Sequence, residues 1–282
     1  MAVPVRDLCI IVGASSGFGR ALAQTFAERF CAQTPAERRL HLVLVGRRQA
    51  DLQTTSDACQ PTSPARVDLT PVAEVDLANL DALDANVDRV LDTVTTNCCT
   101  LTDAVSPGPA RYARATLILN AGTLGGVTLP VRDRSWRELR TFFDVNFVAY
   151  TAFFTAFLKR VDRGVCSDHR TVVNVSSLLA VKAFPSWGAY APAKAARHMF
   201  AQVAAAEEDP AYTKVLSYSP GPLANDMQRT VRETLGDPEQ KLLYTNMFDK
   251  GDLVSMEDSA RKAVDLILDN TFTSGCHIDY YD

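Results

Sequence analysis

The chain has 282 residues, 47% of them hydrophobic, and a formal net charge of −4 with charges of both signs interspersed. This length suffices for a large core, and a single α/β domain of this size is ordinary. The sequence has no basic block typical of nucleic-acid binding, no run of about 18 apolar residues for a membrane span, and no room before Leu8 for a signal peptide. We therefore expect a cytoplasmic protein without nucleic-acid or membrane partners.

The seven cysteines are odd in number, and most are scattered along the chain. Cys98 and Cys99 are adjacent, and no pair has the spacing of a zinc site. We expect reduced thiols and no bound metal.

Short apolar runs alternate with segments of helical spacing along the chain. Seven runs are predicted to be strands: 8–12, 40–46, 71–77, 115–122, 171–177, 214–221 and 275–282. Amphipathic helices are predicted at 18–30 and 79–94. This alternation predicts one α/β domain over residues 1–282, with a parallel sheet covered by helices on both faces. The polar segment 95–114, which contains Pro-Gly-Pro, is predicted to be a surface insertion.

A glycine-rich stretch, GASSGFGRALA, follows the first predicted strand and opens the first helix. A strand, a glycine turn and a helix amino terminus form an anion site, because glycines let the backbone approach a pyrophosphate and free N–H groups favour negative charge. The glycine spacing is one residue wider than usual between the first two. The predicted phosphate-binding residues are Gly13, Ala14, Ser15, Ser16, Gly17, Phe18 and Gly19.

Two arginines follow the second predicted strand. In dinucleotide-binding folds an acidic residue at this place suits a free ribose 2′-hydroxyl, whereas a basic residue suits a 2′-phosphate. Here Arg47 and Arg48 occupy the place, and the next carboxylate is Asp51. Alone they could be solvated surface side chains, but their position at the strand end favours NADP(H) over NAD(H).

Seven short motifs follow one another along the chain: GASSGFG (13–19), VDL (75–77), NAG (120–122), Asn146 in DVNFVA, NVSS (174–177), YAPAK (190–194) and SPGPL (219–223). In order and spacing they resemble the short-chain dehydrogenases/reductases, over nearly the whole chain. Two residues depart from that pattern. Pro192 stands inside the Tyr-x-x-x-Lys motif, where it is tolerable only in the first helical turn, and Asn225 replaces a cofactor-bonding threonine of many relatives.

The resemblance implies a doubly wound, Rossmann-type fold and a bound nicotinamide cofactor, for which the arginines indicate NADP(H). Beyond the glycine stretch and the two arginines, the cofactor contacts that it implies are Asp76, Leu77, Asn120, Lys194, Leu223, Ala224, Asn225, Asp226, Met227 and Gln228.

Four residues are predicted to carry catalysis. Hydride transfer to a ketone leaves an alkoxide that needs a proton, and Tyr190 is the predicted acid. Lys194 lies one helical turn on, and its charge is expected to lower the phenol pKa. Ser177 can polarise the substrate carbonyl, and the resemblance adds Asn146 as support for a proton relay. Each alone could be a surface, capping or packing residue, but together and in this order they predict catalysis.

The carboxyl-terminal stretch HIDYYD resembles a branch of the family that reduces pterin side-chain ketones. In that branch the aspartate matching Asp279 accepts two hydrogen bonds from the pterin, as a carboxylate does from a guanidinium. Alone, the stretch could be an acidic tail. The predicted substrate contacts are Ser177, Leu178, Tyr190, Gly221 and Asp279, with Leu178, Phe184, Trp187 and Met227 as candidate apolar walls that could equally be core or lid packing.

The segment 140–161 is apolar nearly all round, which predicts a helix buried on every side. The resemblance implies that this helix and the one near 190–208 form a homodimer interface, and the alternative is an ordinary core helix. The sequence as a whole favours an NADPH-dependent reductase of pterin ketones. Two alternatives stay open: a carbonyl reductase of broad substrate range and a non-catalytic NADP-binding module.

Overall fold

Seven parallel strands form one sheet in the order β3-β2-β1-β4-β5-β6-β7, as a computed structural model that describes residues 5–59, 66–95 and 111–282 shows. The strands are β1 (Arg6–Val12), β2 (Arg39–Val45), β3 (Val67–Val72), β4 (Tyr112–Leu119), β5 (Cys166–Val175), β6 (Thr213–Ser219) and β7 (His277–Asp279). Their nearly continuous apolar sequences suit strands that are covered on both faces. The doubly wound fold predicted from the sequence is confirmed.

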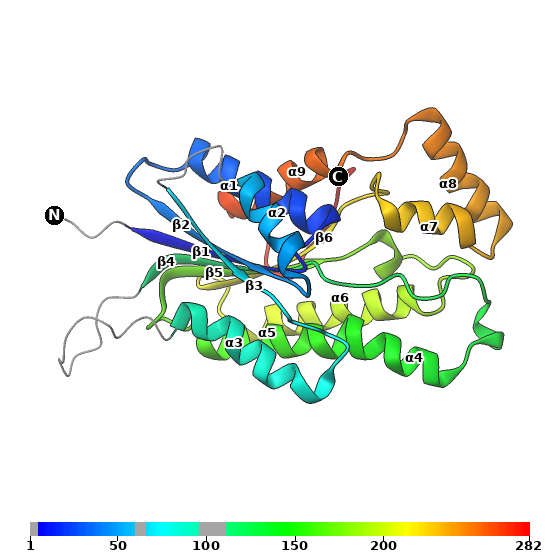
Figure 1. Ribbon diagram of the computed structural model, residues 1–282, viewed down its shortest axis with the longest axis horizontal. Helices are drawn as coiled ribbons and strands as arrows, with labels where there is room; N and C mark the ends of the chain where they lie inside the picture. The colour runs from blue at the N-terminus through cyan, green and yellow to red at the C-terminus, as the bar shows by residue number, and fades with distance from the viewer. Residues whose placement is uncertain (1–4, 60–65, 96–110) are drawn as a thin grey trace.

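Helices cover both faces of the sheet (Figure 1). They are α1 (Gly17–Gln33), α2 (Gln49–Cys59), α3 (Leu83–Thr95), α4 (Trp136–Phe143), α5 (Ala149–Arg160), α6 (Tyr190–Glu207), α7 (Asp226–Thr234), α8 (Pro238–Lys250) and α9 (Met256–Asp269). One layer contains α1, α2 and α9, and the other contains α3, α5 and α6. The pair α7 and α8 lies beyond the carboxyl ends of the strands, so these two helices border the end of the sheet where ligands bind in such folds.

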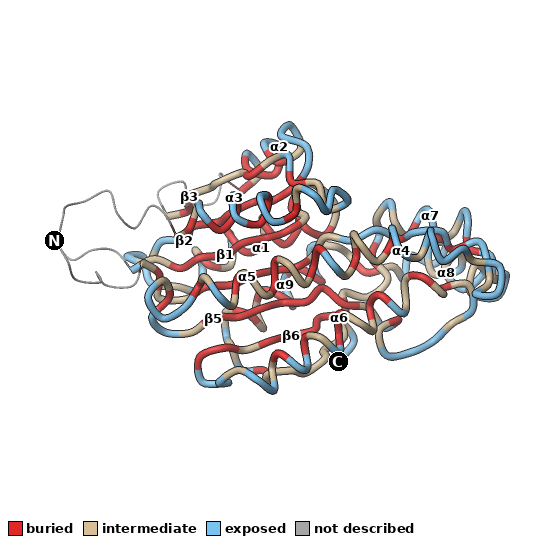
Figure 2. Tube along the Cα trace, turned by 90° about the horizontal axis from the view of Figure 1, so that it is seen from below, coloured by how far each residue is buried: buried red, intermediate tan, exposed pale blue. Residues whose placement is uncertain are grey.

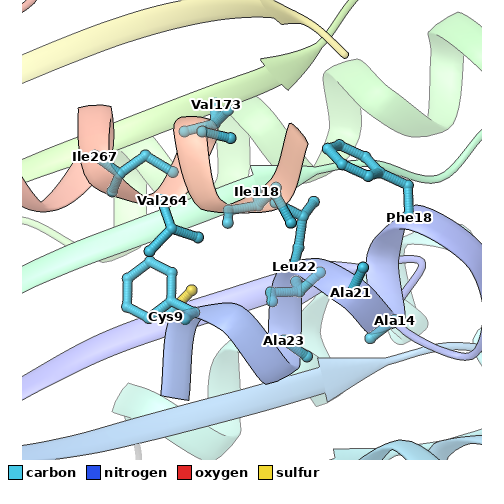
Figure 3. Packing of buried hydrophobic residues seen from close by; sticks show 14 of the residues in the cluster. Cys9, Ala14, Phe18, Ala21, Leu22, Ala23, Ile118, Val173, Val264 and Ile267 are labelled. Atoms are coloured by element: carbon cyan, nitrogen blue, oxygen red, sulfur yellow. The ribbon is translucent and has the colours of Figure 1, made fainter. Parts of the chain in front are cut away.

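The core has one part on each face of the sheet. On one face α1 and α9 pack together, with Leu22 of α1 and Val264 of α9 meeting Ile118 of β4 and Val173 of β5 (Figure 3). The strands are the most deeply buried elements, whereas α7 and α8 have long exposed stretches (Figure 2). The rigid part of the molecule is therefore the sheet, and the elements at its carboxyl end are less covered.

Two predicted segments differ from the structure. The third strand was predicted at residues 71–77, but β3 runs from Val67 to Val72, where it ends its pairing with β2. The predicted insertion 95–114 is wrong at its ends, because Thr95 ends α3 and residues 112–114 belong to β4. Residues 96–110 lie outside the described residues, as do Cys98 and Cys99. The five described cysteines, Cys9, Cys31, Cys59, Cys166 and Cys276, are free thiols.

The apolar segment 140–161 is not buried on every side. It belongs to a continuous helical stretch, Trp136–Arg160, that is long and apolar enough to cross a membrane by length and composition alone. One side of it packs into the core through Phe153, Phe154 and Phe157. Its other side leaves Val148 39% exposed. Within one chain, this helix is thus a half-covered helix of the fold with an apolar outer face.

Candidate active site

A cleft of about 490 Å³ lies at the carboxyl ends of the strands. It is lined by residues that directly follow five of them: Gly13 after β1, Gly46 after β2, Asn120 after β4, Ser176 after β5 and Pro220 after β6. The strand order reverses between β1 and β4, and open α/β sheets bind ligands at such a switch point. The topology thus places the cleft where a dinucleotide site is expected.

The glycine turn forms one wall of this cleft. Gly13 has a φ of +93°, which favours glycine, and a Cβ there would come within 2.8 Å of Ala121. At Gly19 a Cβ would lie 1.9 Å from the carbonyl oxygen of Gly13. Asn120 donates from Nδ2 to that carbonyl at 2.9 Å and so ties the turn to the end of β4. Gly13 and Gly19 therefore leave no room for a side chain, and the cradle at the start of α1 fits the pyrophosphate of a dinucleotide.

Arg47 and Arg48 line the same cleft, directly after Gly46. Both are exposed, and Nε of Arg48 pairs with the carboxylate of Asp51 one turn into α2. The cleft therefore presents positive charge at the end of β2, in the place where the sequence predicted a 2′-phosphate contact.

Most predicted cofactor residues line the cleft: Gly13, Ser15, Ser16, Gly17, Phe18, Arg47, Arg48, Asp76, Leu77, Asn120, Lys194, Leu223, Asn225, Asp226 and Met227. Four do not line it: Ala14, Gly19, Ala224 and Gln228. The amide of Gln228 is engaged elsewhere, since it donates to the carbonyl of Tyr244 and accepts from Nε of Arg232. Asn225 begins α7, where its Oδ1 accepts from the N–H of Gln228 at 2.9 Å.

Tyr190 and Lys194 both line the cleft from the first turns of α6. Pro192 lies between them in the first helical turn, as the sequence required. Nζ of Lys194 donates to the main-chain carbonyl of Val175 at 2.7 Å, which anchors it to the end of β5, and lies 5.5 Å from the centre of the Tyr190 ring. The helix spacing therefore brings the predicted acid and its neighbouring amine to one site.

The charge near Tyr190 differs from the expectation. Burial raises the pKa of the Tyr190 phenol to about 12, and the positive charge of Arg197 acts in the opposite direction. Burial, and then the charge of Arg197, hold the pKa of Lys194 well below its usual range. The charge of Arg197 thus lowers the phenol pKa, and burial lowers the pKa of Arg197 itself. The expected effect of the Lys194 charge on the phenol stays a prediction.

Ser177 and Asn146 have defined partners. Oγ of Ser177 accepts from the N–H of Leu179 at 3.2 Å and caps the short helix η5 (Leu178–Ala180), which leaves its O–H free to donate. The Asn146 amide accepts from the N–H of Thr123 at 2.8 Å and donates to the Thr123 hydroxyl and the Phe142 carbonyl. These bonds use both amide N–H groups of Asn146, so its part in the predicted relay stays a prediction.

Asp279 ends β7, in register with Ser219 of β6. Its carboxylate accepts from the N–H of Tyr281 at 3.2 Å, and it is not among the residues that line the cleft. Gly221, which follows β6 with a φ of +78°, packs against Tyr280 next to it. Leu178 is 46% exposed at the start of η5. Asp279, Gly221 and Leu178 lie at the same end of the sheet as the cleft. Their role as substrate contacts stays a prediction.

Three candidate apolar walls lie together. Trp187 and the partly buried Phe184 and Met227 belong to one hydrophobic cluster, together with Tyr190. The Trp187 ring meets the Tyr190 ring edge-on, with centroids 5.7 Å apart, and its Nε1 has no hydrogen-bond partner in the described part of the chain. These side chains pack beside the predicted acid, but of the three only Met227 lines the cleft, so their role as walls of a substrate site stays a prediction.

Sequence reasoning missed two residues of this site. Ser176, the residue directly before the predicted Ser177, lines the cleft. Its Oγ is buried and has no hydrogen-bond partner among the described residues. Arg197 is only 1% exposed, but the residues around it in the sequence do not indicate that it is buried. It stands three residues after Lys194 in α6, which places the two on one side of the helix. That helical spacing was the one available signal.

Several known proteins are similar to this chain in sequence. The short chain dehydrogenase family matches residues 109–236. Sepiapterin reductase from Bos taurus is 35% identical over 281 residues, covering 98% of this chain and 95% of that protein. Sepiapterin reductase from Xenopus laevis is 33% identical over 276 residues, with 98% and 95% covered. Benzil reductase ((S)-benzoin forming) from Bacillus subtilis is 27% identical over 233 residues, with 81% and 79% covered.

Solved structures share the architecture at lower identity. The KRED1-Pglu enzyme has a TM-score of 0.75 at 22% identity, covering 96% of this chain and 100% of that one. A short chain dehydrogenase/reductase from Saccharomyces cerevisiae has a TM-score of 0.74 at 21% identity, covering 99% and 96%. These similarities show the fold.

Proposed function

Because the chain belongs to the short-chain dehydrogenase/reductase family, in which it aligns over 98% of its length with sepiapterin reductases, we propose that it is itself a sepiapterin reductase. It reduces the side-chain ketones of sepiapterin and 6-pyruvoyl-tetrahydropterin, a step of tetrahydrobiopterin synthesis. The alignment along the whole chain carries this proposal. The test is NADPH oxidation by the purified protein with sepiapterin, and absence of turnover would contradict the assignment.

The chain is an oxidoreductase that acts on C=O and CH–OH groups with a nicotinamide cofactor. When bound, the cofactor supplies the hydride. Ser177 orients and polarises the ketone through its free O–H, and Tyr190 gives its proton to the oxygen as negative charge develops there. Lys194 holds its place by the bond to Val175 and is positioned to bind ribose hydroxyls. A non-catalytic binding module would not need these three groups together.

The preference for NADPH is part of the proposal, and it is supported by Arg47 and Arg48 in the cleft wall. Replacing both with Ala is expected to weaken NADPH at least about tenfold, because charge-assisted bonds to the 2′-phosphate are lost. NADH has no such phosphate, so its affinity should stay nearly constant. Fluorescence titration of both cofactors measures the contrast.

Arg261→Ala is a matched control for this experiment. Arg261 is also exposed and pairs with Asp258 at the same helical spacing that joins Arg48 to Asp51, but it does not line the cleft. It should leave both affinities unchanged. Equal losses for NADPH and NADH in the double variant would show that the two arginines do not bind the phosphate.

A second candidate is a carbonyl reductase of broad range, because benzil reductases are also among the relatives. Benzil is an apolar diketone, and the apolar cluster around Trp187 would accommodate aromatic rings of either substrate. Comparing kcat/KM for sepiapterin and benzil separates the two functions. A large preference for sepiapterin supports the first, and equal or higher values for benzil support the second.

A homodimer through α5 and α6 is proposed from the apolar outer face of these helices. Val148, in the helical turn directly before α5, is 39% exposed, and Met199 and Val203 of α6 are 59% and 48% exposed. Phe147, in the same turn as Val148, meets Phe200 of α6 with ring centroids 6.2 Å apart. Light scattering should give twice the chain mass of 30.8 kDa at micromolar concentration. We expect a dimer because an exposed apolar face is stabilised when a second copy of the chain covers it.

Variants of α6 test which surface forms the dimer. Met199→Glu with Val203→Glu should give a monomer, because two unpaired carboxylates would be buried. Leu242→Glu on α8, at a residue that is also 59% exposed, should leave the dimer intact. A monomeric unsubstituted protein, or a dimer that survives the paired substitution, would contradict the proposal.

A further inference from the structure

Arg197 lies on the face of α6 that carries the site. Tyr190, Lys194 and Arg197 are spaced by four and three residues, so they follow one side of the helix. Unlike the other two, Arg197 is not among the residues that line the cleft, and it is 1% exposed. It belongs to none of the motifs that indicate the family.

The guanidinium connects three elements of the site. It donates to the carbonyls of Leu119 at 2.5 Å and Ala121 at 3.1 Å, on both sides of Asn120 at the end of β4. It also donates from Nε to Oδ1 of Asn174 at 3.0 Å, near the end of β5. Asn120 in turn holds the glycine turn at Gly13. One side chain thus links α6 to two strand ends that form the cleft.

The charge of Arg197 is not neutralised nearby. In residues 5–59, 66–95 and 111–282, no carboxylate lies within ion-pairing distance of it, and all its partners are neutral oxygens. The titratable groups that face it are Tyr150 of α5, whose ring centre lies 4.3 Å from the guanidinium carbon, and Tyr190 and Lys194 of α6. Tyr244 of α8 also faces the Tyr190 phenol and raises its pKa. Its hydrogen bonds to three neutral oxygens and the facing Tyr150 ring offset part of the cost of burying this charge.

We propose that Arg197 is a positioning residue of the active site: it fixes the ends of β4 and β5 against α6 and supplies a permanent positive charge behind Tyr190 and Lys194. An arginine suits this role because its guanidinium stays charged when buried, whereas a lysine there would lose its proton. The charge stabilises the phenolate that remains after Tyr190 has given its proton to the substrate. This inference rests on the proposed reductase mechanism, but not on the identity of the ketone.

The test is the pH dependence of kcat/KM in Arg197→Met, which removes the charge from a side chain of similar length. Loss of a nearby positive charge raises the pKa of a phenol, and reduction needs the protonated phenol. The alkaline limb of the profile is therefore expected to move to higher pH. Arg197→Gln keeps a hydrogen-bond donor but lacks the charge, so it should move the alkaline limb in the same direction. This second variant allows the test to be made if Arg197→Met does not fold.

A readout without turnover accompanies the profile. Ultraviolet difference titration, taken between each protein and its Tyr190→Phe counterpart, isolates the ionisation of this phenol, which should also shift upward in the Arg197 variants. Arg170→Met is the matched control, because Arg170 of β5 is also buried, at 5% exposed, but pairs with Glu208 and does not line the cleft. It should lower the melting temperature and leave the limb in place.

Two outcomes would overturn the proposal. One is an unchanged limb and phenol titration in folded Arg197 variants, and the other is an equal shift in Arg170→Met. The profile can be measured with sepiapterin or with benzil. If the unsubstituted protein reduces only benzil, the sepiapterin assignment fails while the test of Arg197 still stands.

Discussion

Tyr190→Phe is expected to lower kcat by about 10²- to 10⁴-fold, the usual range for losing a general acid. The substitution keeps the ring, with its edge-on contact to Trp187, and removes only the hydroxyl. NADPH binding, measured by fluorescence titration, should stay within a fewfold. Turnover near that of the unsubstituted protein would remove Tyr190 from the mechanism.

The pH profile of the unsubstituted protein adds a second check on Tyr190. Burial raises the pKa of its phenol, so the proton that reduction requires is held throughout neutral pH. Reduction should therefore be flat near neutrality and decline only as pH rises through the phenol pKa. In Tyr190→Phe the residual activity should lose this alkaline decline, because no phenol remains to titrate at that place.

Asp279→Ala is expected to lower kcat/KM for sepiapterin by about 30- to 150-fold, which corresponds to about 2–3 kcal/mol. The pterin would lose a carboxylate that accepts two hydrogen bonds side by side. Asp279→Asn should lose nearly as much, because an amide cannot accept both bonds in that arrangement. A diketone such as benzil has no such donors, so its reduction should barely change in either variant.

Asp282→Asn controls for disturbance of the terminal stretch. Its carboxylate accepts from the N–H of Asp279 at 2.7 Å but has no proposed contact with substrate. It should leave both substrates nearly unaffected. If sepiapterin and benzil fall together in the Asp279 variants, the residue supports the fold there instead of the pterin, and only the carbonyl-reductase function survives.

The strands were predictable because burial on both faces leaves an unmistakable apolar signature, as in β1 and β2. The third strand was misplaced because β3 has polar and partly exposed residues such as Asp68 and Thr70, so its apolar signal is weak. α7 and α8 could not be located from periodicity, since few of their residues are buried. Periodicity reports burial, and it fails where the chain leaves the core.

The residues of the site also differ in whether they could be inferred from the sequence. Residues fixed by local geometry, such as Gly13 and the pair Tyr190 and Lys194, could be inferred because turns and helical turns have set spacings. Arg197 could not, because its partners come from β4 and β5, far away in sequence. The engagement of the Asn146 amide likewise depends on Thr123 in another segment. Contacts between residues that are far apart in the sequence cannot be inferred from local spacing and require the folded structure.

The position of β7 has a consequence for how the site responds to stress. β7 is a three-residue strand at the edge of the sheet and pairs only with β6, whereas β1 and β4 stand in its middle. Edge elements open by local unfolding at a lower free energy than central ones do. If Asp279 binds the substrate, affinity for the pterin includes the free energy of keeping this strand closed, and affinity for the dinucleotide does not. Mild denaturant should thus release the pterin first, while the glycine cradle still holds its nucleotide.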